Sequence, residues 1–381
     1  MEFGWTDADL TFRKELQEFV NRELEEGWSL EQRKLGSPEN AAFSRAFAAK
    51  LAARGWLIPH WPEEQGGSGN TPWQHIIMGE ELWGVGEPRG PQYMNVNWIG
   101  PAIIRYGTEQ QRAEHLSRIA SGDVIWCQGF SEPDAGSDLG SLRTRAIRDG
   151  DEYVVNGTKI WTSYASVADY CFLLVRTDPT APARSAITVL LVPTSIPGLE
   201  VRPIGAIAGD HALHELVFTD VRVPVSCRLG AENGGWELVR EALAFERVGA
   251  PRYARAARVL DELMASAAAD GTALPGALRE RIGLARAACE AARLLAYRVI
   301  DERAAGLPPS PSVYVARAAM VQAERAVGSV ALEVMGADGL VEGSLADDQF
   351  RRSMVAGVVA GSYEMQMNLV GKLLLGLPKG P

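Results

Sequence analysis

Several familiar signatures are missing from this chain of 381 residues. It has no Walker loop, no G-x-G-x-x-G turn after a strand-like run and no G-x-S-x-G elbow. These absences argue against a P-loop enzyme, a Rossmann dinucleotide fold and an α/β-hydrolase. The five histidines include one closely spaced pair, His211 and His214, just before a strand-like run. We interpret them as surface or pocket-lining side chains and expect no metal site.

Cysteine is also scarce, and acidic residues outnumber basic ones. The four cysteines, Cys127, Cys171, Cys227 and Cys289, are far apart and form no C-x-x-C pair, which favours free thiols in a reducing compartment. The net charge of -10 argues against non-specific nucleic-acid binding. No apolar run approaches the roughly 18 residues that span a bilayer, and the first residues lack secretory-signal features. We therefore expect a cytoplasmic protein that binds neither nucleic acid nor membrane.

The patterns that are present change twice along the chain. Residues 1–122 show helical spacing, with a capping box at Thr108-Glu-Gln-Gln111. Residues 123–230 contain short β-rich runs, with a hairpin turn expected at Asp149-Gly150-Asp151. Residues 231–381 are helical again. This order predicts an α+β multidomain fold with an all-α N-terminal domain, a β-barrel or sandwich middle domain and a C-terminal four-helix bundle.

Individual elements can be placed within these regions. The last region should hold helices at about 232–268, 276–305, 312–335 and 362–375. In the middle region we expect the following strands: Val124–Trp126, Tyr153–Val155, Tyr170–Val175, Ile187–Val192 and Glu215–Phe218.

Two segments at the ends of strand-like runs carry the functional prediction. Gly129-Phe-Ser-Glu-Pro-Asp-Ala-Gly-Ser-Asp-Leu-Gly-Ser141 offers small residues and backbone N–H groups, and Asn156-Gly-Thr-Lys-Ile-Trp-Thr-Ser163 offers an indole beside two hydroxyls. A flavin needs both, because its pyrimidine edge is polar and its rings are flat and apolar. The pair of segments predicts a flavoenzyme.

Both segments resemble signatures of the acyl-CoA dehydrogenase family. Glu333-Val-Met-Gly-Ala-Asp-Gly339, Gly361-Ser-Tyr-Glu-Met-Gln366 and Leu375-Gly-Leu-Pro378 are similar to the C-terminal part of that family. The resemblance covers essentially the whole chain in order. It implies FAD as cofactor, α,β-dehydrogenation of an acyl-CoA or acyl-carrier thioester to the trans-2-enoyl product, an electron-transferring flavoprotein as acceptor, and a homotetramer or heterotetramer.

The resemblance also implies roles for individual residues. Ser131 and the N–H groups from Gln128 through Phe130 to Ser131 would face the pyrimidine edge, where donors stabilise the charge that develops as the flavin accepts a hydride. Trp161 would cover the rings, with Thr162 and Ser163 beside it. Taken alone, Ser131 is more often turn chemistry and Trp161 more often a core residue.

Further positions match cofactor and substrate contacts of the family. Ser137 corresponds to an acyl-CoA contact, although a turn or helix cap is an equally good interpretation. The C-terminal positions that correspond to cofactor contacts are Glu333, Gly336, Ser362 and Glu364. The first two of these match a contact made between subunits.

The catalytic base is the most demanding assignment. A carboxylate in an apolar pocket suits removal of a thioester α-proton, because desolvation raises its pKa. Most family members carry this Glu before a Gly-Thr or Gly-Ser pair, and that slot is Ala360 here. Isovaleryl- and long-chain-type members carry a Glu before an Arg earlier in the last domain, which makes Glu246 the candidate base and Arg247 its positioning or substrate-binding neighbour. Without the family context, a solvated helical Glu would be the favoured interpretation.

One departure keeps alternatives open. Many relatives have an Arg-x-x-Phe-Gly segment that contacts a neighbouring subunit's FAD, and the equivalent residues 267–275 contain neither Arg nor Phe. With the missing Glu at 360, this motivates a non-catalytic or half-site partner subunit of a heterotetramer as the alternative. A flavin oxidase or monooxygenase on the same fold is the other.

Overall fold

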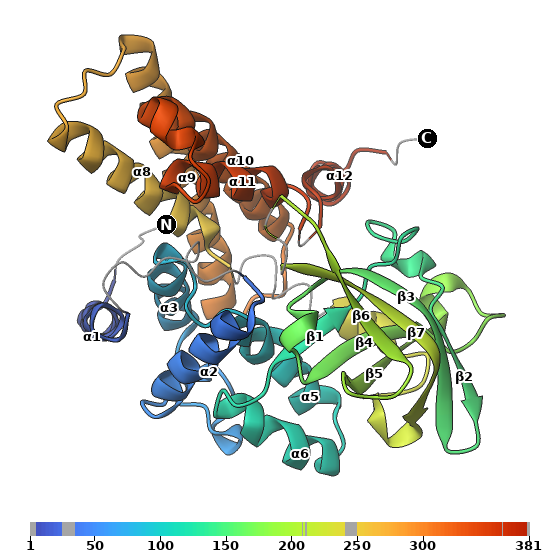
Figure 1. Ribbon diagram of the computed structural model, residues 1–381. Helices are drawn as coiled ribbons and strands as arrows, with labels where there is room; N and C mark the ends of the chain where they lie inside the picture. The colour runs from blue at the N-terminus through green and yellow to red at the C-terminus, as the bar shows by residue number, and fades with distance from the viewer. Residues whose placement is uncertain are drawn as a thin grey trace. The chain divides into compact units, whose positions relative to one another are not determined.

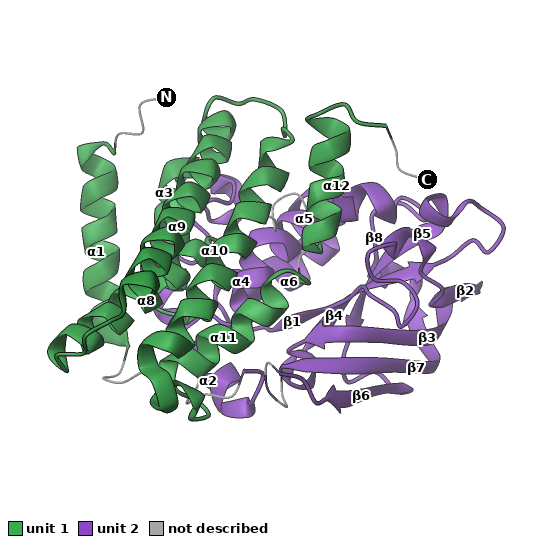
Figure 2. Cartoon of the chain, turned by 90° about the horizontal axis from the view of Figure 1, so that it is seen from above, with its two compact units in different colours: residues 1–32, 70–88, 246–381 green, residues 33–69, 89–245 purple. Residues whose placement is uncertain are grey.

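The computed structural model describes residues 5–24, 35–207, 209, 212–240, 250–359 and 361–378. The chain divides into two compact units, each discontinuous in sequence. Unit 1 comprises residues 1–32, 70–88 and 246–381, and unit 2 comprises residues 33–69 and 89–245, drawn in green and purple in Figure 2. Helices from the first 122 residues are thus shared between both units, and the three contiguous domains stay a prediction.

Unit 1 is built from helices. Their bounds are α1 Asp7–Glu23, α3 Pro72–Gly84, α8 Arg252–Ala269, α9 Gly276–Ala304, α10 Ser312–Met335, the short η7 Gly336–Leu340, α11 Leu345–Ala356 and α12 Tyr363–Leu373. Small and aliphatic side chains of α8, α9 and α10 form one apolar core, which holds these helices as a bundle (Figure 2). Gly328 of α10 lets α11 approach closely, because an added Cβ would lie 2.5 Å from Ser353 Oγ.

Two helix predictions for this region need correction. A continuous helix over 232–268 is wrong, because Ala250 and Pro251 are not helical and α8 begins at Arg252. Proline lacks the N–H that a helix interior needs and disfavours the helical conformation in the residue before it. The sequence interpretation also missed α11, although Ser344 was its signal: the Ser344 hydroxyl accepts the Asp347 N–H at 3.2 Å as an N-cap.

Most helices of unit 2 precede its sheet, and a helical stretch at 235–240 follows it. The helices before the sheet are α2 Pro38–Ala52, η1 Glu63–Gln65, α4 Gln92–Met94, the π-helical η2 Asn95–Ile99, α5 Gly100–Tyr106 and α6 Glu109–Ala120. The capping box expected at the start of α6 is confirmed, since Thr108 Oγ1 accepts the Gln111 N–H and the Gln111 side chain accepts the Thr108 N–H. Asn95 joins η2 to the sheet, because its amide accepts the Trp126 N–H and donates to the Val124 carbonyl.

The strands of unit 2 form one sheet among the described residues (Figure 1). Their bounds are β1 Trp126–Gly129, β2 Arg145–Asp149, β3 Glu152–Ser163, β4 Tyr170–Arg176, β5 Ile187–Pro193, β6 Leu199–Ile204, β7 Leu213–Pro224 and β8 Arg228–Leu229. Their order is β6-β7-β3-β2-β4-β5-β8, and β1 pairs with β4 in parallel. Short 3-10 turns lie at Leu139–Ser141, Ala165–Val167, Ala183–Ala186 and Val225–Cys227.

The sheet confirms most of the predicted β pattern. Asp149 pairs with Glu152 across the expected hairpin, where Gly150 adopts a φ of +62°. The run expected at Val124–Trp126 forms a strand only from Trp126 onward, so β1 lies two residues later than predicted. The helical, β and helical parts of the expected fold are confirmed. Among the described helices, none combines the length and apolarity needed to cross a bilayer.

Candidate cofactor site

The end of β1 leads directly into the first predicted flavin segment. Gly129 is required there, because an added Cβ would lie 2.8 Å from Leu173 Cδ1 and 2.9 Å from Cys171 Sγ on neighbouring β4. Phe130 follows and is buried, with its ring 6.0 Å from that of Phe172. The loop after it leaves Ser131 half-buried and accessible.

Trp161 lies on a β-bulge near the end of β3. Lys159 pairs with Leu216 and Thr162 with His214, so three steps along β3 match two along β7. The bulge holds Trp161 at a φ of +61° and leaves its indole 55% exposed. A left-handed conformation costs a bulky residue on the order of 1–3 kcal/mol, and such strain is concentrated at functional sites. An exposed indole held at this cost favours a ligand-stacking surface over a core residue.

The structure brings the two predicted segments together. The Ile160 N–H donates to the Ser131 carbonyl at 2.9 Å, so Ser131 is bonded to the residue next to Trp161. The serine hydroxyl makes no hydrogen bond to the part of the chain that the structure describes. The Ser131 loop and the strand segment that carries the exposed indole are thus joined at the backbone of unit 2.

Thr162 supplies a second polar group at this place. Its side chain is buried, and Oγ1 has no hydrogen-bond partner among the described residues. Buried hydroxyls without a partner are uncommon in native proteins and call for a ligand or a water. Ser163 of β3 pairs with Leu213 and is half-buried. Gln128 of β1, which pairs with Phe172 of β4, is also half-buried.

These features fit a flavin. The exposed Trp161 indole provides a flat apolar surface, and the two segments that meet here also carry the Ser131 and Thr162 hydroxyls, neither of which has a hydrogen-bond partner among the described residues. A tricyclic ring with one polar edge is the kind of group that such a combination accommodates. Ser137, the predicted substrate contact, is exposed farther along the same loop, and no hydrogen bond ties it to the described residues.

In unit 1, Glu333 and Gly336 lie at the C-terminal end of α10. Glu333 forms an ion pair with Arg281 at 2.5 Å and borders a pocket of about 560 Å³ between α10 and α11. The other side chains around this pocket are Arg325, Ser329, Leu332, Phe350, Ser353 and Met354. Gly336 ends α10 at a φ of +58°, which a residue with a Cβ adopts only with strain.

Ser362 and Glu364 lie at the start of α12. The Ser362 hydroxyl caps this helix by accepting the Met365 N–H at 3.2 Å, and Glu364 is exposed in its first turn. Tyr363 contacts α10 near Gln322, with 2.8 Å between the tyrosine oxygen and the amide nitrogen. Because a helix rises 1.5 Å per residue, this contact is roughly 16 Å along α10 from Glu333. Within one chain, the two C-terminal pairs therefore lie apart.

The candidate base Glu246 and its neighbour Arg247 lie outside the described residues, as does Ala360. Their assignment stays a prediction. The described chain near them is helical at 235–240 and resumes at Ala250.

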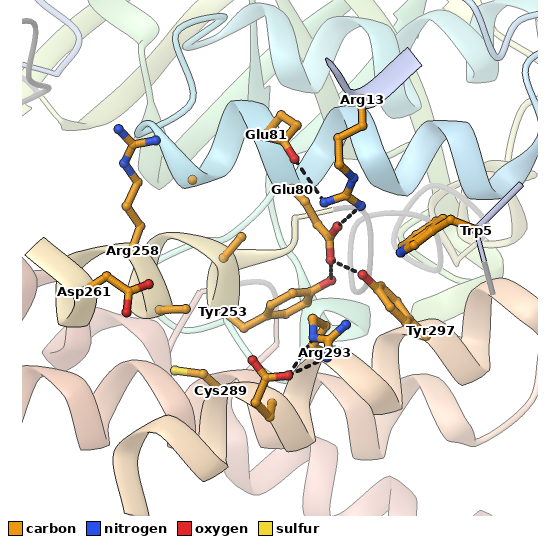
Figure 3. Close-up of a pocket in the computed structure, with 14 residues that line it drawn as sticks. Trp5, Arg13, Glu80, Glu81, Tyr253, Arg258, Asp261, Cys289, Arg293 and Tyr297 are labelled. Atoms are coloured by element: carbon orange, nitrogen blue, oxygen red, sulfur yellow. Dashed lines mark hydrogen bonds and ion pairs between the residues drawn. The ribbon is translucent and has the colours of Figure 1, made fainter. Parts of the chain in front are cut away.

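Unit 1 also holds a polar cluster that sequence reasoning did not identify (Figure 3). The buried Glu80 carboxylate accepts hydrogen bonds from Tyr253 at 2.9 Å, from Tyr297 at 2.8 Å and from Arg13 at 2.7 Å. Burial raises the pKa of Tyr297 to about 12, so its hydroxyl stays a donor at neutral pH. Since every partner of Glu80 belongs to α1, α8 or α9, this cluster links four helices of unit 1.

Sequence reasoning also missed Glu132 and Lys159. Lys159 is fully buried on β3 and its Nζ lies 2.8 Å from Glu132 Oε1. The available signal was alternation along the strand: Tyr153 and Val155 face the core, and Lys159 falls on the same alternating face. A charged residue at such a position predicts a buried partner.

The exposed indole leads to a direct test. Trp161→Ser should weaken FAD binding about 5- to 150-fold, because stacking on an aromatic side chain contributes about 1–3 kcal/mol. Ile147→Ser is the matched control, since Ile147 is also 55% exposed on the same sheet. Titration of the stripped proteins with FAD measures both. Equal affinity in the two variants would contradict the stacking role of Trp161.

Comparison with known proteins identifies the family that the whole chain resembles. Residues 6–123, 127–221 and 233–375 match, in order, the family models for the N-terminal, middle and C-terminal domains of acyl-CoA dehydrogenase. Acyl-CoA dehydrogenase IpdE1 of Mycobacterium tuberculosis is 34% identical, and the alignment covers 91% of this chain and 92% of the relative. Acyl-CoA dehydrogenase FadE26 of the same organism is 35% identical, with 88% of each chain covered.

Solved structures agree with these relatives. The Tcur3481-Tcur3483 steroid ACAD superposes with a TM-score of 0.91 at 31% identity, and all of both chains is covered. The ChsE4-ChsE5 complex from Mycobacterium tuberculosis gives a TM-score of 0.85 at 31% identity, again over all of both chains.

Proposed function

The chain belongs to the acyl-CoA dehydrogenase family, and from that premise we propose that it oxidises an acyl-CoA to the trans-2-enoyl-CoA with FAD. The observation that supports this most is the exposed indole of Trp161, on a strained backbone next to Ile160, whose N–H donates to the Ser131 carbonyl. When bound, FAD supplies the hydride acceptor of the reaction. The substrate loses an α-proton and a β-hydride, and the electrons pass on to an electron-transferring flavoprotein.

The residues of unit 2 hold and polarise the cofactor. The Ser131 hydroxyl and the N–H groups of Gln128 to Ser131 would donate to the pyrimidine edge and stabilise the negative charge that develops there. Trp161 would stack on the rings, and Thr162 and Ser163 would offer their hydroxyls. In unit 1, Glu333 and Gly336 serve a neighbouring subunit's cofactor, in keeping with their separation from Ser362 and Glu364 along α10.

Glu246 acts as the general base in this proposal. It takes the α-proton of the thioester while Arg247 fixes its carboxylate or contacts the substrate. Support comes from the sequence: Ala360 fills the slot where most of the family carries the base, and Glu246-Arg247 stands in the alternative slot. Ser137 contacts the acyl-CoA.

For the acyl group, we propose a bulky polycyclic, steroid-derived portion. The support is that a structure matching the whole of this chain is a steroid ACAD. Straight-chain acyl-CoA is the alternative that the test below separates.

We further propose a tetramer built with a second kind of chain. The similar solved structures include two that each pair two different chains, Tcur3481 with Tcur3483 and ChsE4 with ChsE5. Residues 267–275 lack the Arg and Phe that many relatives use to contact a neighbour's FAD, so a partner chain would supply that contact. Exposed apolar side chains on α11, α12 and beyond provide surface for association: Met354, Met367, Leu373, Leu374, Leu375 and Leu377.

The reaction class is tested by product analysis. The protein, purified alone and with a co-expressed partner chain, is incubated with a steroid-derived and a straight-chain acyl-CoA, using either an artificial electron acceptor or oxygen alone. We expect loss of two hydrogen atoms from the polycyclic substrate, dependent on the added acceptor. Turnover with oxygen alone would indicate an oxidase. A colourless, inactive protein that yields an active one only when mixed with a flavin-containing partner would indicate a non-catalytic subunit.

A further inference from the structure

Two opposite charges are buried beneath the loop that carries Ser131. Lys159 is 0% exposed and Glu132 is 7% exposed, and their closest approach is 2.8 Å. Burying such a pair costs several kcal/mol of desolvation per ion and is a weak source of stability. In some proteins such a pair serves to fix one arrangement of the chain.

The backbone that this pair fixes is the Ser131 loop. Lys159 Nζ donates to the Phe130 carbonyl at 3.1 Å, just before Ser131. The Glu132 carboxylate, just after Ser131, accepts the N–H groups of Arg143 at 2.6 Å and Thr144 at 2.8 Å. Both neighbours of Ser131 are therefore held by buried charge.

Three backbone hydrogen bonds hold the loop further. The Glu132 N–H and carbonyl bond to the Ala135 carbonyl and N–H, each at 3.0 Å, which closes a tight turn. The Ser131 carbonyl accepts the Ile160 N–H, one residue beyond Lys159 on β3. The same strand carries Trp161 two residues beyond Lys159, so Lys159 lies next to both the Ser131 loop and the β-bulge.

We propose that Glu132 and Lys159 are positioning residues that preorganise Ser131 and its neighbouring N–H groups for the flavin's pyrimidine edge, and thereby set flavin affinity and reduction potential. This inference rests on the proposed placement of FAD at Ser131 and Trp161. Neither side chain touches the cofactor in this account. They act through the backbone of the loop.

The charges persist at neutral pH. Burial lowers the pKa of Lys159 to about 8, against the opposing effect of Glu132, so the amine stays protonated near pH 7. Burial acts to raise the pKa of Glu132, but the Lys159 charge and the hydrogen bonds to the carboxylate outweigh it and lower that pKa. The contact is therefore an ion pair under physiological conditions.

The test compares Glu132→Gln and Lys159→Met with a matched control on the same loop. Asp134→Asn also removes one carboxylate charge, but this charge belongs to an exposed ion pair. Asp134 Oδ2 lies 3.6 Å from Arg143 Nη1, and the two side chains are 78% and 79% exposed. For each protein we would measure the FAD dissociation constant, the reduction potential of the bound flavin and the thermal midpoint without FAD.

We expect Glu132→Gln and Lys159→Met to weaken FAD binding on the order of 10- to 100-fold, as removal of orienting residues does at metal sites, and to shift the flavin potential. Asp134→Asn should stay within about 2-fold of the wild type, since exposed ion pairs contribute little. Folded variants with wild-type affinity and potential would overturn the inference.

A double variant covers the case in which a single change prevents folding. Glu132→Gln with Lys159→Met leaves no unpaired buried charge and should fold. Weak FAD binding in the folded double variant would support the positioning role, whereas wild-type affinity and potential would overturn it. Failure of the wild-type protein to bind FAD in any assembly would instead overturn the proposed function, so the two failures are distinguishable.

Discussion

Glu246→Gln should slow reduction of the bound flavin by acyl-CoA about 10²- to 10⁴-fold, the usual contribution of a general base. Glutamine keeps the shape of the side chain but cannot accept the α-proton. Substrate binding should change little, because the substitution keeps the size of the side chain. Stopped-flow absorbance under anaerobic conditions measures the rate of flavin bleaching directly.

A matched control and a rescue sharpen this test. Glu237→Gln changes an exposed carboxylate in the preceding helical stretch at 235–240 and should leave the rate unchanged. Placing Glu in the other family slot, as Ala360→Glu in the Glu246→Gln background, should restore part of the rate. Wild-type bleaching by the single Glu246→Gln variant would show that another group removes the proton.

Glu80→Ala should lower the free energy of unfolding of unit 1 by about 3 kcal/mol, since removing one partner of a buried charged network is strongly destabilising. The change would remove the Glu80 acceptor from the Tyr253 and Tyr297 hydroxyls and leave Glu81 as the carboxylate partner of Arg13 among the described residues. A fall of roughly 6–12 °C in thermal midpoint is expected at this size. Differential scanning calorimetry provides the measurement.

Glu290→Gln is the control, because Glu290 lines the same pocket of unit 1 as Glu80. Glu290 pairs with Arg293 at 2.5 Å but is half exposed, so its loss should cost less than about 1 kcal/mol. At a temperature where the Glu80→Ala variant is still folded, the flavin content and turnover of that variant should match those of the wild type. A loss of activity without a loss of stability would show that the Glu80 cluster serves the chemistry after all.

The elements that sequence predicted best are those with strong local signals. The capping box at Thr108 and the hairpin at Gly150 depend on residues whose side chains or backbone conformations determine the local turn. The break at Pro251 had an equally local cause and was overlooked because helical spacing continues on both sides of it. The division into two compact units could not be predicted from local patterns, because α1 and α3 join the last helices through contacts that are distant in sequence.

For the candidate site, the motifs predicted residues but not the way they are held. Gly129, Ser131 and Trp161 stand out in sequence because their chemistry matches a flavin. The β-bulge that strains Trp161 depends on pairing with β7, more than fifty residues away, which no local pattern reveals. The role of Lys159 likewise depends on Glu132, 27 positions earlier, meeting it in the core.

The most direct test of the central claim is an anaerobic titration of the purified flavoprotein with acyl-CoA, followed by the visible absorbance of the flavin. One equivalent of a suitable acyl-CoA per flavin should bleach this absorbance and yield the trans-2-enoyl-CoA. A flavin that stays oxidised with every acyl thioester in the panel, in protein assembled with its partner chain, would contradict it.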